Sequence, residues 1–311
     1  MSTHGGLETK VPPTVLVLGG IVSVQFGGAL AVTLIPQIGA GGSVLLRLGI
    51  AALILGAVAR PRWRGHPGAA WRTVVAFGVT LGLMNFTFYS ALARLPIGVA
   101  VTLEFLGPLV LAAVLSRRWT DGLAVLVAAG GVALIAQVVQ VPFADLDHLG
   151  IALGLLTGVF WAMYVIFSGR TGAQFRQLDG LAIALVIGSL VVMPFGVGSI
   201  PTWSGPVVLK GVGIAVLSSL IPYSLELIAL RRLRASVFGI LLSLEPAVAA
   251  GAGLLVLGQR LTPWQLAGMG LVVLASILVL GRPTPAEPDP RLAADVPGGT
   301  DVDGPQIDPA A

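Results

Sequence analysis

The sequence contains ten apolar runs of about 17–24 residues, each long enough to cross about 30 Å of hydrocarbon as a helix. Backbone groups inside a bilayer must be hydrogen-bonded within the protein, and a helix satisfies this requirement along its own length. The pattern therefore predicts an all-α integral membrane protein with ten transmembrane helices. We expect them at residues 14–35, 42–60, 73–93, 97–115, 121–139, 149–168, 180–198, 207–230, 235–257 and 263–281.

Composition supports lipid as the main solvent of this chain. Hydrophobic residues make up 56% of it and charged residues only 10%, whereas soluble domains carry about 25% charged residues. Such a chain cannot cover a water-facing surface of its own size. The 42 glycines are typical of membrane bundles, in which small residues let helix backbones approach closely.

Positive charges are distributed unevenly over the predicted loops. With the N-terminus in the cytoplasm, the cytoplasmic segments contain about 14 Lys and Arg residues, against 3 on the opposite side (Arg94, Lys210 and Arg260). This bias predicts a multi-pass plasma-membrane protein with both termini in the cytoplasm.

The ends of the chain differ from its apolar middle. Residues 1–13 form a short polar segment, which we expect to be cytoplasmic, and the first apolar run is too long for the core of a signal peptide. Residues 282–311 are rich in Pro, Asp, Gly and Ala without apolar periodicity. We expect this segment to be a disordered cytoplasmic tail.

Several function classes are excluded by residue type. The chain has no cysteine, which excludes disulfides, thiolate catalysis and Cys-based zinc sites. Its histidines, His4, His66 and His148, all fall in predicted loops, so we expect no metal site and no Ser-His catalytic pair inside the membrane. The arginines form no basic face with aromatic platforms, which argues against nucleic-acid binding. We therefore expect a non-enzyme without cofactors.

The two halves of the chain resemble each other weakly. Residues 91–108 and 229–246 each contain an Arg-Leu loop followed by a span with a Glu…Pro element. Because five spans per half is an odd number, the second half enters the membrane from the opposite side. Inverted repeats are typical of alternating-access transporters, although Leu-rich helices can also align by chance. The two predicted repeats are residues 14–139 and 149–281.

Four charged residues lie within the predicted spans: Arg47, Glu104, Glu226 and Glu245. A charge at the bilayer centre costs roughly 2.5–3.5 kcal/mol on insertion scales, so each requires a reason. Pro108 and Pro246 follow two of the glutamates, and a proline can open a helix locally because it frees the carbonyl four residues earlier. A carboxylate beside such an opening is a candidate ligand for an ammonium group, or a proton carrier. The alternative is a structural glutamate paired with Arg47.

Two of the charges have a second interpretation. Arg47 lies about one turn inside a span, where it can either extend to the lipid headgroups or hold a carboxylate in a cavity. Glu226 is close to Arg231 and Arg232, and an ion pair at the membrane boundary is the alternative to a substrate site there.

Uncharged polar residues occur at a similar depth, and each is either a cavity residue or a hydrogen-bonding contact between helices. They are Gln25, Asn85, Tyr89, Trp161, Tyr164, Ser218, Ser219 and Tyr223. Gly150, Gly154 and Gly158 repeat every four residues, which predicts a close-packing helix face, with a gating role as the alternative.

Ten spans in two repeats, with Leu244-Glu245-Pro246 and the later Gly258-Gln259-Arg260-Leu261-Thr262-Pro263, resemble the EamA branch of the drug/metabolite transporter superfamily. That family usually has Glu where Gln259 stands, so the resemblance implies that a loop role of the acid is lost here. Within the superfamily, the chain is similar to the bacterial inner-membrane exporters of threonine and homoserine over nearly its whole length except residues 282–311. The supporting segments are residues 23–29, 46–48, 84–86, 97–105, 116–118 and 222–226.

The resemblance implies a secondary transporter that exports small amino acids by proton exchange; composition and spacing alone indicate only a transporter with buried carboxylates. In this hypothesis Arg47 orients the substrate carboxylate, and Glu104 or Glu245 meets the amine or carries the proton. Aromatic side chains would shape the cavity, namely Trp161, Tyr164 and Tyr223. Two alternatives are efflux of drugs or other metabolites on the same fold, and a non-transporting scaffold or lipid-modifying enzyme. Both a monomer and a homodimer are compatible with the sequence.

Overall fold

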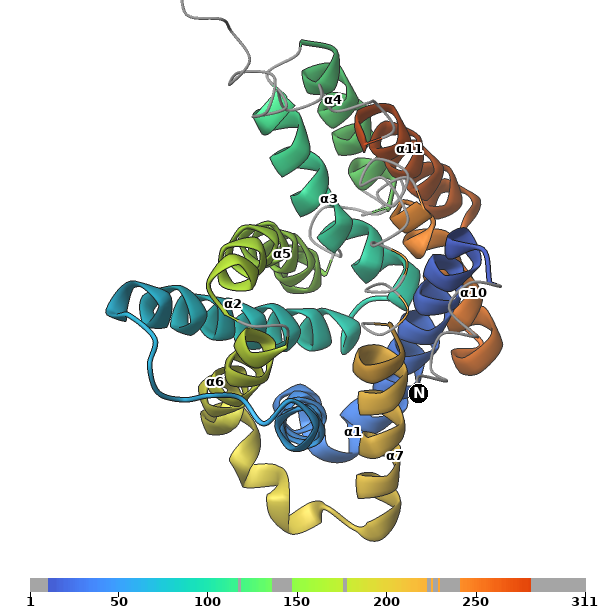
Figure 1. Ribbon diagram of the computed structural model, residues 1–311. Helices are drawn as coiled ribbons and strands as arrows, with labels where there is room; N and C mark the ends of the chain where they lie inside the picture. The colour runs from blue at the N-terminus through green and yellow to red at the C-terminus, as the bar shows by residue number, and fades with distance from the viewer. Residues whose placement is uncertain are drawn as a thin grey trace, which may run out of the picture.

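The computed structural model describes residues 11–116, 119–135, 147–175, 178–222, 225, 229 and 241–280. The described part of the chain is helical and contains no strand (Figure 1), which confirms the all-α prediction. Its elements are α1 (Pro13–Ala59), α2 (Gly68–Leu92), α3 (Ile97–Ser116), α4 (Trp119–Ile135), α5 (His148–Gln174), α6 (Asp179–Gly196), η2 (Val197–Thr202), α7 (Gly205–Ala215), η3 (Val216–Leu220), α10 (Glu245–Leu257) and α11 (Pro263–Leu280).

Each of the ten apolar runs contains helix, although parts of the fifth, eighth, ninth and tenth runs lie outside the described residues. Four stretches are long and apolar enough to cross a membrane by length and composition: Pro13–Ala59, Gly68–Leu92, His148–Gln174 and Asp179–Thr202. The remaining apolar helices in the described part are shorter. The number of ten passages therefore stays a prediction.

The first two predicted spans are joined within α1 rather than by a loop. The helix is broken at Gly39 alone, whose φ is +72° and ψ is 169°. Residues with a side chain rarely adopt a positive φ, so glycine is the residue that permits this break. The connection expected between the spans at 14–35 and 42–60 is thus reduced to a kink between two helical halves, which we call the first half (13–38) and the second half (40–59) of α1.

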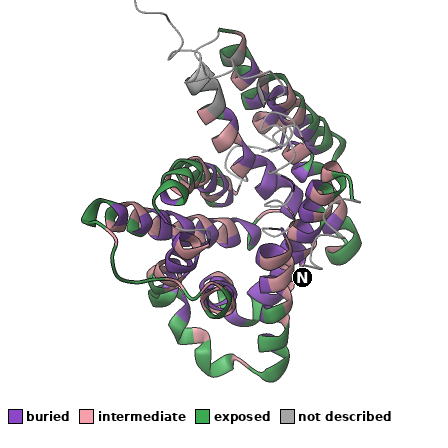
Figure 2. Cartoon of the chain, viewed as in Figure 1, coloured by how far each residue is buried: buried purple, intermediate pink, exposed green. Residues whose placement is uncertain are grey.

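The helices pack into one bundle whose outer surface is apolar. Neighbouring pairs include α2 with α5 and α6, α3 with α5, and α4 with α11, which lie side by side in Figure 1. Exposed residues follow the outside of the bundle, whereas buried residues face its interior (Figure 2). Large apolar side chains are among the most exposed, such as Leu53 at 75% and Leu255 at 76%. An apolar exterior of this kind is suited to lipid.

Glycines on α5 allow α3 to approach closely. A Cβ atom on Gly154 would lie 2.9–3.0 Å from the Leu103 side chain, and one on Gly158 would lie 2.8 Å from the carbonyl oxygen of Glu104. Gly150 in the same way lies against Leu95. These contacts confirm the close-packing face predicted from the four-residue glycine repeat.

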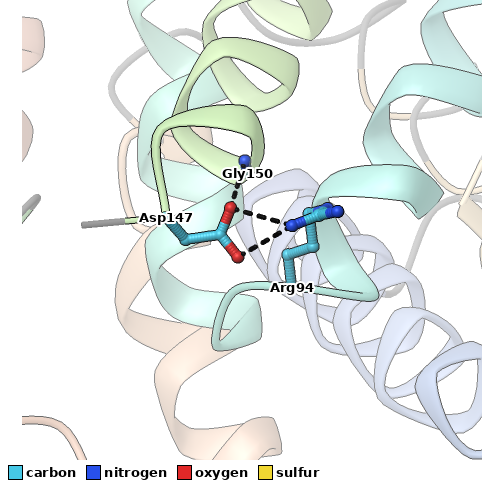
Figure 3. Close-up of polar contacts among 3 residues, drawn as sticks. All are labelled: Arg94, Asp147 and Gly150. Carbon is cyan, nitrogen blue, oxygen red and sulfur yellow. Dashed lines mark hydrogen bonds and ion pairs between the residues drawn. The ribbon is translucent and has the colours of Figure 1, made fainter. Parts of the chain in front are cut away.

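Two polar contacts link the connections at one end of the bundle. Arg94, between α2 and α3, donates from Nη1 to both carboxylate oxygens of Asp147 at 3.2 Å, and Asp147 Oδ1 also accepts from the Gly150 backbone N–H at 2.7 Å (Figure 3). Asp147 thereby caps α5. Gln259, between α10 and α11, accepts from the backbone N–H of Ile97 at the start of α3 through Oε1, at 3.0 Å. The amide at position 259 thus provides an acceptor although the acid of the family pattern is absent.

Candidate functional site

A cavity of about 450 Å³ lies among α1, α2, α3, α5, η3 and α10. Ligand pockets in proteins typically enclose about 300–1,000 Å³, so the cavity is large enough for a small molecule. Most of the residues predicted as a site line it. They are Gln25, Arg47, Asn85, Tyr89, Glu104, Trp161, Tyr164 and Glu245.

The other predicted site residues have different positions. Ser219 is buried, with 3% of its surface exposed, but it is not part of the cavity lining, whereas the neighbouring Ser218 is. Tyr223 and Glu226 lie outside the described residues.

Several lining residues were not predicted, and most of them are apolar: Val24, Gly28, Met84, Phe88, Val165, Ser168 and Leu242. Ser168 follows Tyr164 by four residues and Trp161 by seven, so helical spacing would have placed it on the same face. Phe88 likewise follows Asn85 by three residues. The remaining apolar residues carry no comparable signal, because every face of these helices is apolar.

Arg47, in the second half of α1, lies in the cavity and is 9% exposed. Its Nη1 donates to Asn85 Oδ1 at 2.7 Å and to Tyr89 Oη at 3.4 Å, and its Nη2 donates to the Ser218 carbonyl oxygen at 3.1 Å. The guanidinium carbon also lies 5.7 Å from the centroid of the Tyr89 ring, within the range of a cation–π interaction. Of the two interpretations of Arg47, the geometry supports the cavity rather than the headgroups.

The carbonyl that Arg47 contacts lies in a π-turn that is followed by a proline. In η3 the Ile221 N–H bonds to the Val216 carbonyl five residues earlier, so the Leu217 carbonyl loses its α-helical donor. The Ser218 carbonyl loses its donor as well, because the residue four positions later is Pro222, which has no N–H. The hydroxyl of Ser23 donates to the Leu217 oxygen at 2.7 Å, while Arg47 donates to the Ser218 oxygen.

Close packing brings the first half of α1 to this π-turn. A Cβ atom on Gly27 would lie 3.0 Å from both the backbone nitrogen and the Cβ of Ser218. Such contacts are tighter than side chains normally accept, so glycine at this position lets the two backbones meet. π-Turns are frequent at functional sites, and this one forms part of the cavity wall.

Glu245 is the first residue of α10 and is 8% exposed. The ninth predicted span was expected to be continuous over 235–257, but Ser243 and Leu244 form a turn immediately before Glu245. The expectation that Glu245 lies in the middle of a helix is therefore wrong, and the predicted opening beside Pro246 is present. Its carboxylate lies at a helix N-terminus, which carries partial positive charge. Gln25 on α1 donates from Nε2 to Glu245 Oε2 at 3.4 Å.

Glu104 lies in the interior of α3, and the opening expected beside Pro108 is absent because α3 continues through this proline. Pro108 nevertheless leaves the Glu104 carbonyl without its helical donor. This carbonyl packs against Gly158 of α5, as described above. The Glu104 side chain lines the cavity and is near enough to Glu245 and Arg47 to interact electrostatically with both.

The cavity thus combines one guanidinium with two carboxylates. A guanidinium suits a carboxylate ligand because it presents paired donors, and a carboxylate suits an ammonium ligand. Trp161 and Tyr164 form part of an aromatic wall, packed against Phe105 and Phe77 with ring-centroid distances of 5.5 and 5.3 Å. Among the described residues no group of three or more His, Cys, Asp or Glu side chains could hold a metal ion.

An apolar exterior, long apolar helices and a charged cavity inside the bundle define a multi-pass membrane transporter. The family model of the EamA-like transporter family matches residues 148–281. The chain is 40% identical over 278 residues to the threonine/homoserine exporter RhtA of Escherichia coli K12, covering 88% of this chain and 93% of that protein. The chain belongs to the EamA-like transporter family, within the drug/metabolite transporter superfamily.

Two further comparisons agree with this assignment. The threonine/homoserine exporter RhtA of Salmonella typhimurium LT2 is 37% identical over 278 residues, again covering 88% of this chain and 93% of that protein. A protein of known crystal structure superimposes with a TM-score of 0.59 at 17% sequence identity, covering 86% of this chain and 95% of the other. At this identity the structural likeness supports the fold alone.

Proposed function

We propose that this protein is a secondary transporter that exports small amino acids of the threonine and homoserine type in exchange for protons. The observation that carries the proposal is the cavity, in which Arg47 on α1, Glu104 on α3 and Glu245 on α10 face one small volume. The names of the relatives support the same substrate class.

A zwitterion matches the charges of this cavity. Arg47 binds the α-carboxylate, and Asn85 and Tyr89 hold the guanidinium in position through their hydrogen bonds to Nη1. Glu245 binds the α-ammonium group, with Glu104 as its neighbour. The side chain of the substrate then lies against the aromatic wall.

Proton coupling follows from the two neighbouring carboxylates. A proton on either Glu104 or Glu245 relieves the repulsion between them, and the substrate ammonium group does the same. The proton and the substrate therefore compete for one site. A carrier that exposes this site to one side of the membrane at a time exchanges the two cations.

We infer that residues 14–139 and 149–281 form inverted repeats, an arrangement typical of alternating-access transporters with a central site. The contacts between helices occur in matching pairs that support this assignment. In one pair, α2 packs on α5, which is the third predicted span on the sixth. The corresponding contact in the other repeat order is η3 on α1, which is the eighth span on the first. In a second pair, α2 packs on α6, which is the third span on the seventh. The corresponding contact is α7 on the second half of α1, the eighth span on the second, where Gly211 lies against Leu46.

The proposed orientation places both termini in the cytoplasm, on the basis of the loop charges. The connections between α1 and α2 and between α5 and α6 then face the cytoplasm, and the connection between α2 and α3 faces outward. Export in this orientation begins at the α5–α6 end of the bundle.

The proposal is tested by release of radiolabelled threonine and homoserine from proteoliposomes that contain the full chain, with and without an imposed proton gradient. We expect gradient-driven release by the wild type and at least a tenfold slower rate for Glu245→Gln. Asp147→Asn serves as the control, because Asp147 caps the start of α5, an asparagine keeps a capping oxygen, and the residue does not line the cavity.

Each outcome of this test has a clear meaning. Equal rates for Glu245→Gln and the wild type would contradict the role of the carboxylate but keep the substrate. Absence of transport of either amino acid by the folded wild type would overturn the substrate assignment, and a screen of other metabolites and drugs would follow.

A further inference from the structure

A second pocket of about 160 Å³ adjoins the central cavity near the connection between α5 and α6. The two share Tyr164 and Ser168 as lining residues. Tyr164 packs on Phe77, which also lines the smaller pocket, at a ring-centroid distance of 5.3 Å. The Tyr164 side chain is therefore a partition between the two spaces, and we call the smaller one the side pocket.

Hydroxyl groups lead from the central cavity into the side pocket along one face of α5. Tyr164, Ser168 and Thr171 are separated by four and then three residues, which is the spacing of neighbours on a helix face. Phe175, four residues further on, also lines the side pocket. The rest of its wall comes mainly from apolar residues of α5 and α6.

Thr171 provides the observation that points to a ligand. It is 2% exposed, and its Oγ1 has no hydrogen-bond partner in the part of the chain that the structure describes. Ser168, one turn earlier, instead donates to the Val165 carbonyl of its own helix at 3.1 Å. Buried hydroxyls are nearly always hydrogen-bonded, so an unpartnered one beside a pocket suits an oxygen or nitrogen atom of a bound molecule.

The connection between α1 and α2, which is cytoplasmic in the proposed orientation, contacts residues at the edge of the side pocket. His66 in this connection lies against the Phe175 ring at a centroid distance of 4.4 Å. The Arg62 backbone N–H contacts Asp179 Oδ2 at 3.5 Å at the start of α6. The side pocket therefore has this connection near one end and the central cavity at the other.

We propose that the side pocket is a second binding site for the transported amino acid, which it occupies before it enters the central cavity. The hydroxyl of Thr171 donates to the carboxylate or side-chain oxygen of the bound amino acid, and movement of Tyr164 admits it to the cavity. This inference rests on the proposed function, because it takes its ligand from the exported substrate.

A pair of glycines on α5 offers a steric test with a matched control. A Cβ atom on Gly172, which lines the side pocket, or on Gly169, which lines neither space, would meet no atom within 4 Å. Gly172→Leu therefore adds an apolar side chain at the wall of the side pocket without a clash at its Cβ, and Gly169→Leu adds the same side chain elsewhere on the helix. With radiolabelled threonine in proteoliposomes, we expect the half-saturation concentration to rise in Gly172→Leu because the leucine takes space from the bound amino acid. The rise should be at least the about 3- to 10-fold that loss of one good hydrogen bond in Thr171→Val should cause. Gly169→Leu should match the wild type.

Thr171→Val removes the hydroxyl at nearly constant shape and keeps the test independent of the leucine variants. Because no hydrogen bond within the protein is lost, the unfolding temperature should stay the same or rise, while the half-saturation concentration increases. Thr102→Val is the control for stability: Thr102 is equally buried but donates to the Gly98 carbonyl at 2.6 Å, so this variant should unfold at a lower temperature.

These results distinguish a failure of the side-pocket proposal from a failure of the proposed transport function. If Gly172→Leu and Thr171→Val both have the half-saturation concentration of the wild type, the side pocket is not a binding site for the transported amino acid. The proposed transport function would be unaffected by that result. A lower unfolding temperature in Thr171→Val would show that its hydroxyl already has a partner in the empty protein, which also overturns the proposal. If the wild type moves neither threonine nor homoserine, the proposed function fails and the side pocket loses its ligand.

Discussion

Arg47 donates a hydrogen bond of 3.1 Å to the backbone carbonyl of Ser218, the acceptor that Pro222 leaves without its helical donor. The contact joins the second half of α1 to η3, and thus the first predicted repeat to the second. The same guanidinium lines the cavity. A substrate carboxylate that binds Arg47 therefore meets a guanidinium that this backbone carbonyl helps to position, and binding can change the contact between the repeats.

Pro222→Ala restores an N–H group that can donate to the Ser218 carbonyl. We expect the unfolding temperature to stay the same or rise, because alanine is the better helix former. Arg47 loses a fixed acceptor and becomes less well positioned, so the half-saturation concentration for threonine should rise by about tenfold, as for loss of a charge-assisted hydrogen bond. Unchanged transport kinetics would show that the Ser218 contact does not position Arg47.

Arg47→Lys keeps the charge but loses the forked guanidinium, whose two Nη atoms donate to Asn85 and Ser218 at the same time. We expect a loss of about 1–3 kcal/mol in stability, since charge-assisted hydrogen bonds are broken, together with weaker substrate binding. Combining it with Pro222→Ala tests the link, because Pro222→Ala should have little further effect on transport once the fork is gone. Effects that add independently, within about 0.5 kcal/mol, would contradict a shared role.

The sequence predicted the helices well for a physical reason. A bilayer requires long apolar runs, so run length alone marks the helices, and each run contains helix in the described part of the chain. Local breaks were harder to predict. Pro108 and Pro246 each follow a glutamate within about one turn, but α3 continues through the first while a turn precedes the second, and a proline by itself does not indicate which of the two occurs.

The charged and aromatic part of the site was predictable, and its apolar part was not. Polar residues within spans stand out against lipid, which is how Arg47, Asn85 and Glu245 could be assigned to the cavity. Met84 and Leu242 also line it, but they resemble the lipid-facing residues of the same helices. Because both the lipid-facing and the packed faces are apolar, no periodicity distinguishes a cavity wall from the outside of the bundle.

Gly158→Ala tests the close approach of α3 and α5. The new Cβ would lie 2.8 Å from the Glu104 carbonyl oxygen and 3.1 Å from the Gly107 nitrogen, so the helices must separate. We expect a loss of about 1–3 kcal/mol, as for overpacking elsewhere, measured by thermal unfolding in detergent. Gly130→Ala on α4 is the control, since its Cβ would meet nothing within 4 Å and alanine should be neutral or add up to about 1 kcal/mol. Equal stability of the two variants would contradict the tight contact.

Substitutions at Arg94 and Asp147 distinguish the stability that an exposed ion pair contributes from the stability that a helix cap contributes. The side chains are 43% and 34% exposed, so Arg94→Ala should cost little, about 0–1 kcal/mol. Asp147→Ala also removes the acceptor for the Gly150 N–H and should cost more, with about 1 kcal/mol from the cap. Asp147→Asn keeps a capping oxygen and should behave like Arg94→Ala. If Asp147→Asn is as damaging as Asp147→Ala, the charge rather than the cap is what stabilises this end of α5.

The competition between protons and substrate predicts a characteristic pH dependence. If both bind the same carboxylates, lowering the pH on the side where the substrate binds adds a competitor, so the half-saturation concentration for threonine should rise while the rate at saturating threonine changes little. In Glu245→Gln the carboxylate that binds the competing proton is gone. The half-saturation concentration for threonine should then be higher than in the wild type but nearly independent of pH.

Glu104→Gln is the informative partner variant, because Glu104 lies near Glu245 and Arg47 but within a continuous helix. A flat profile in Glu104→Gln with a steep one in Glu245→Gln would assign the competing proton to Glu104 instead, and a steep profile in both single variants would show that either carboxylate suffices.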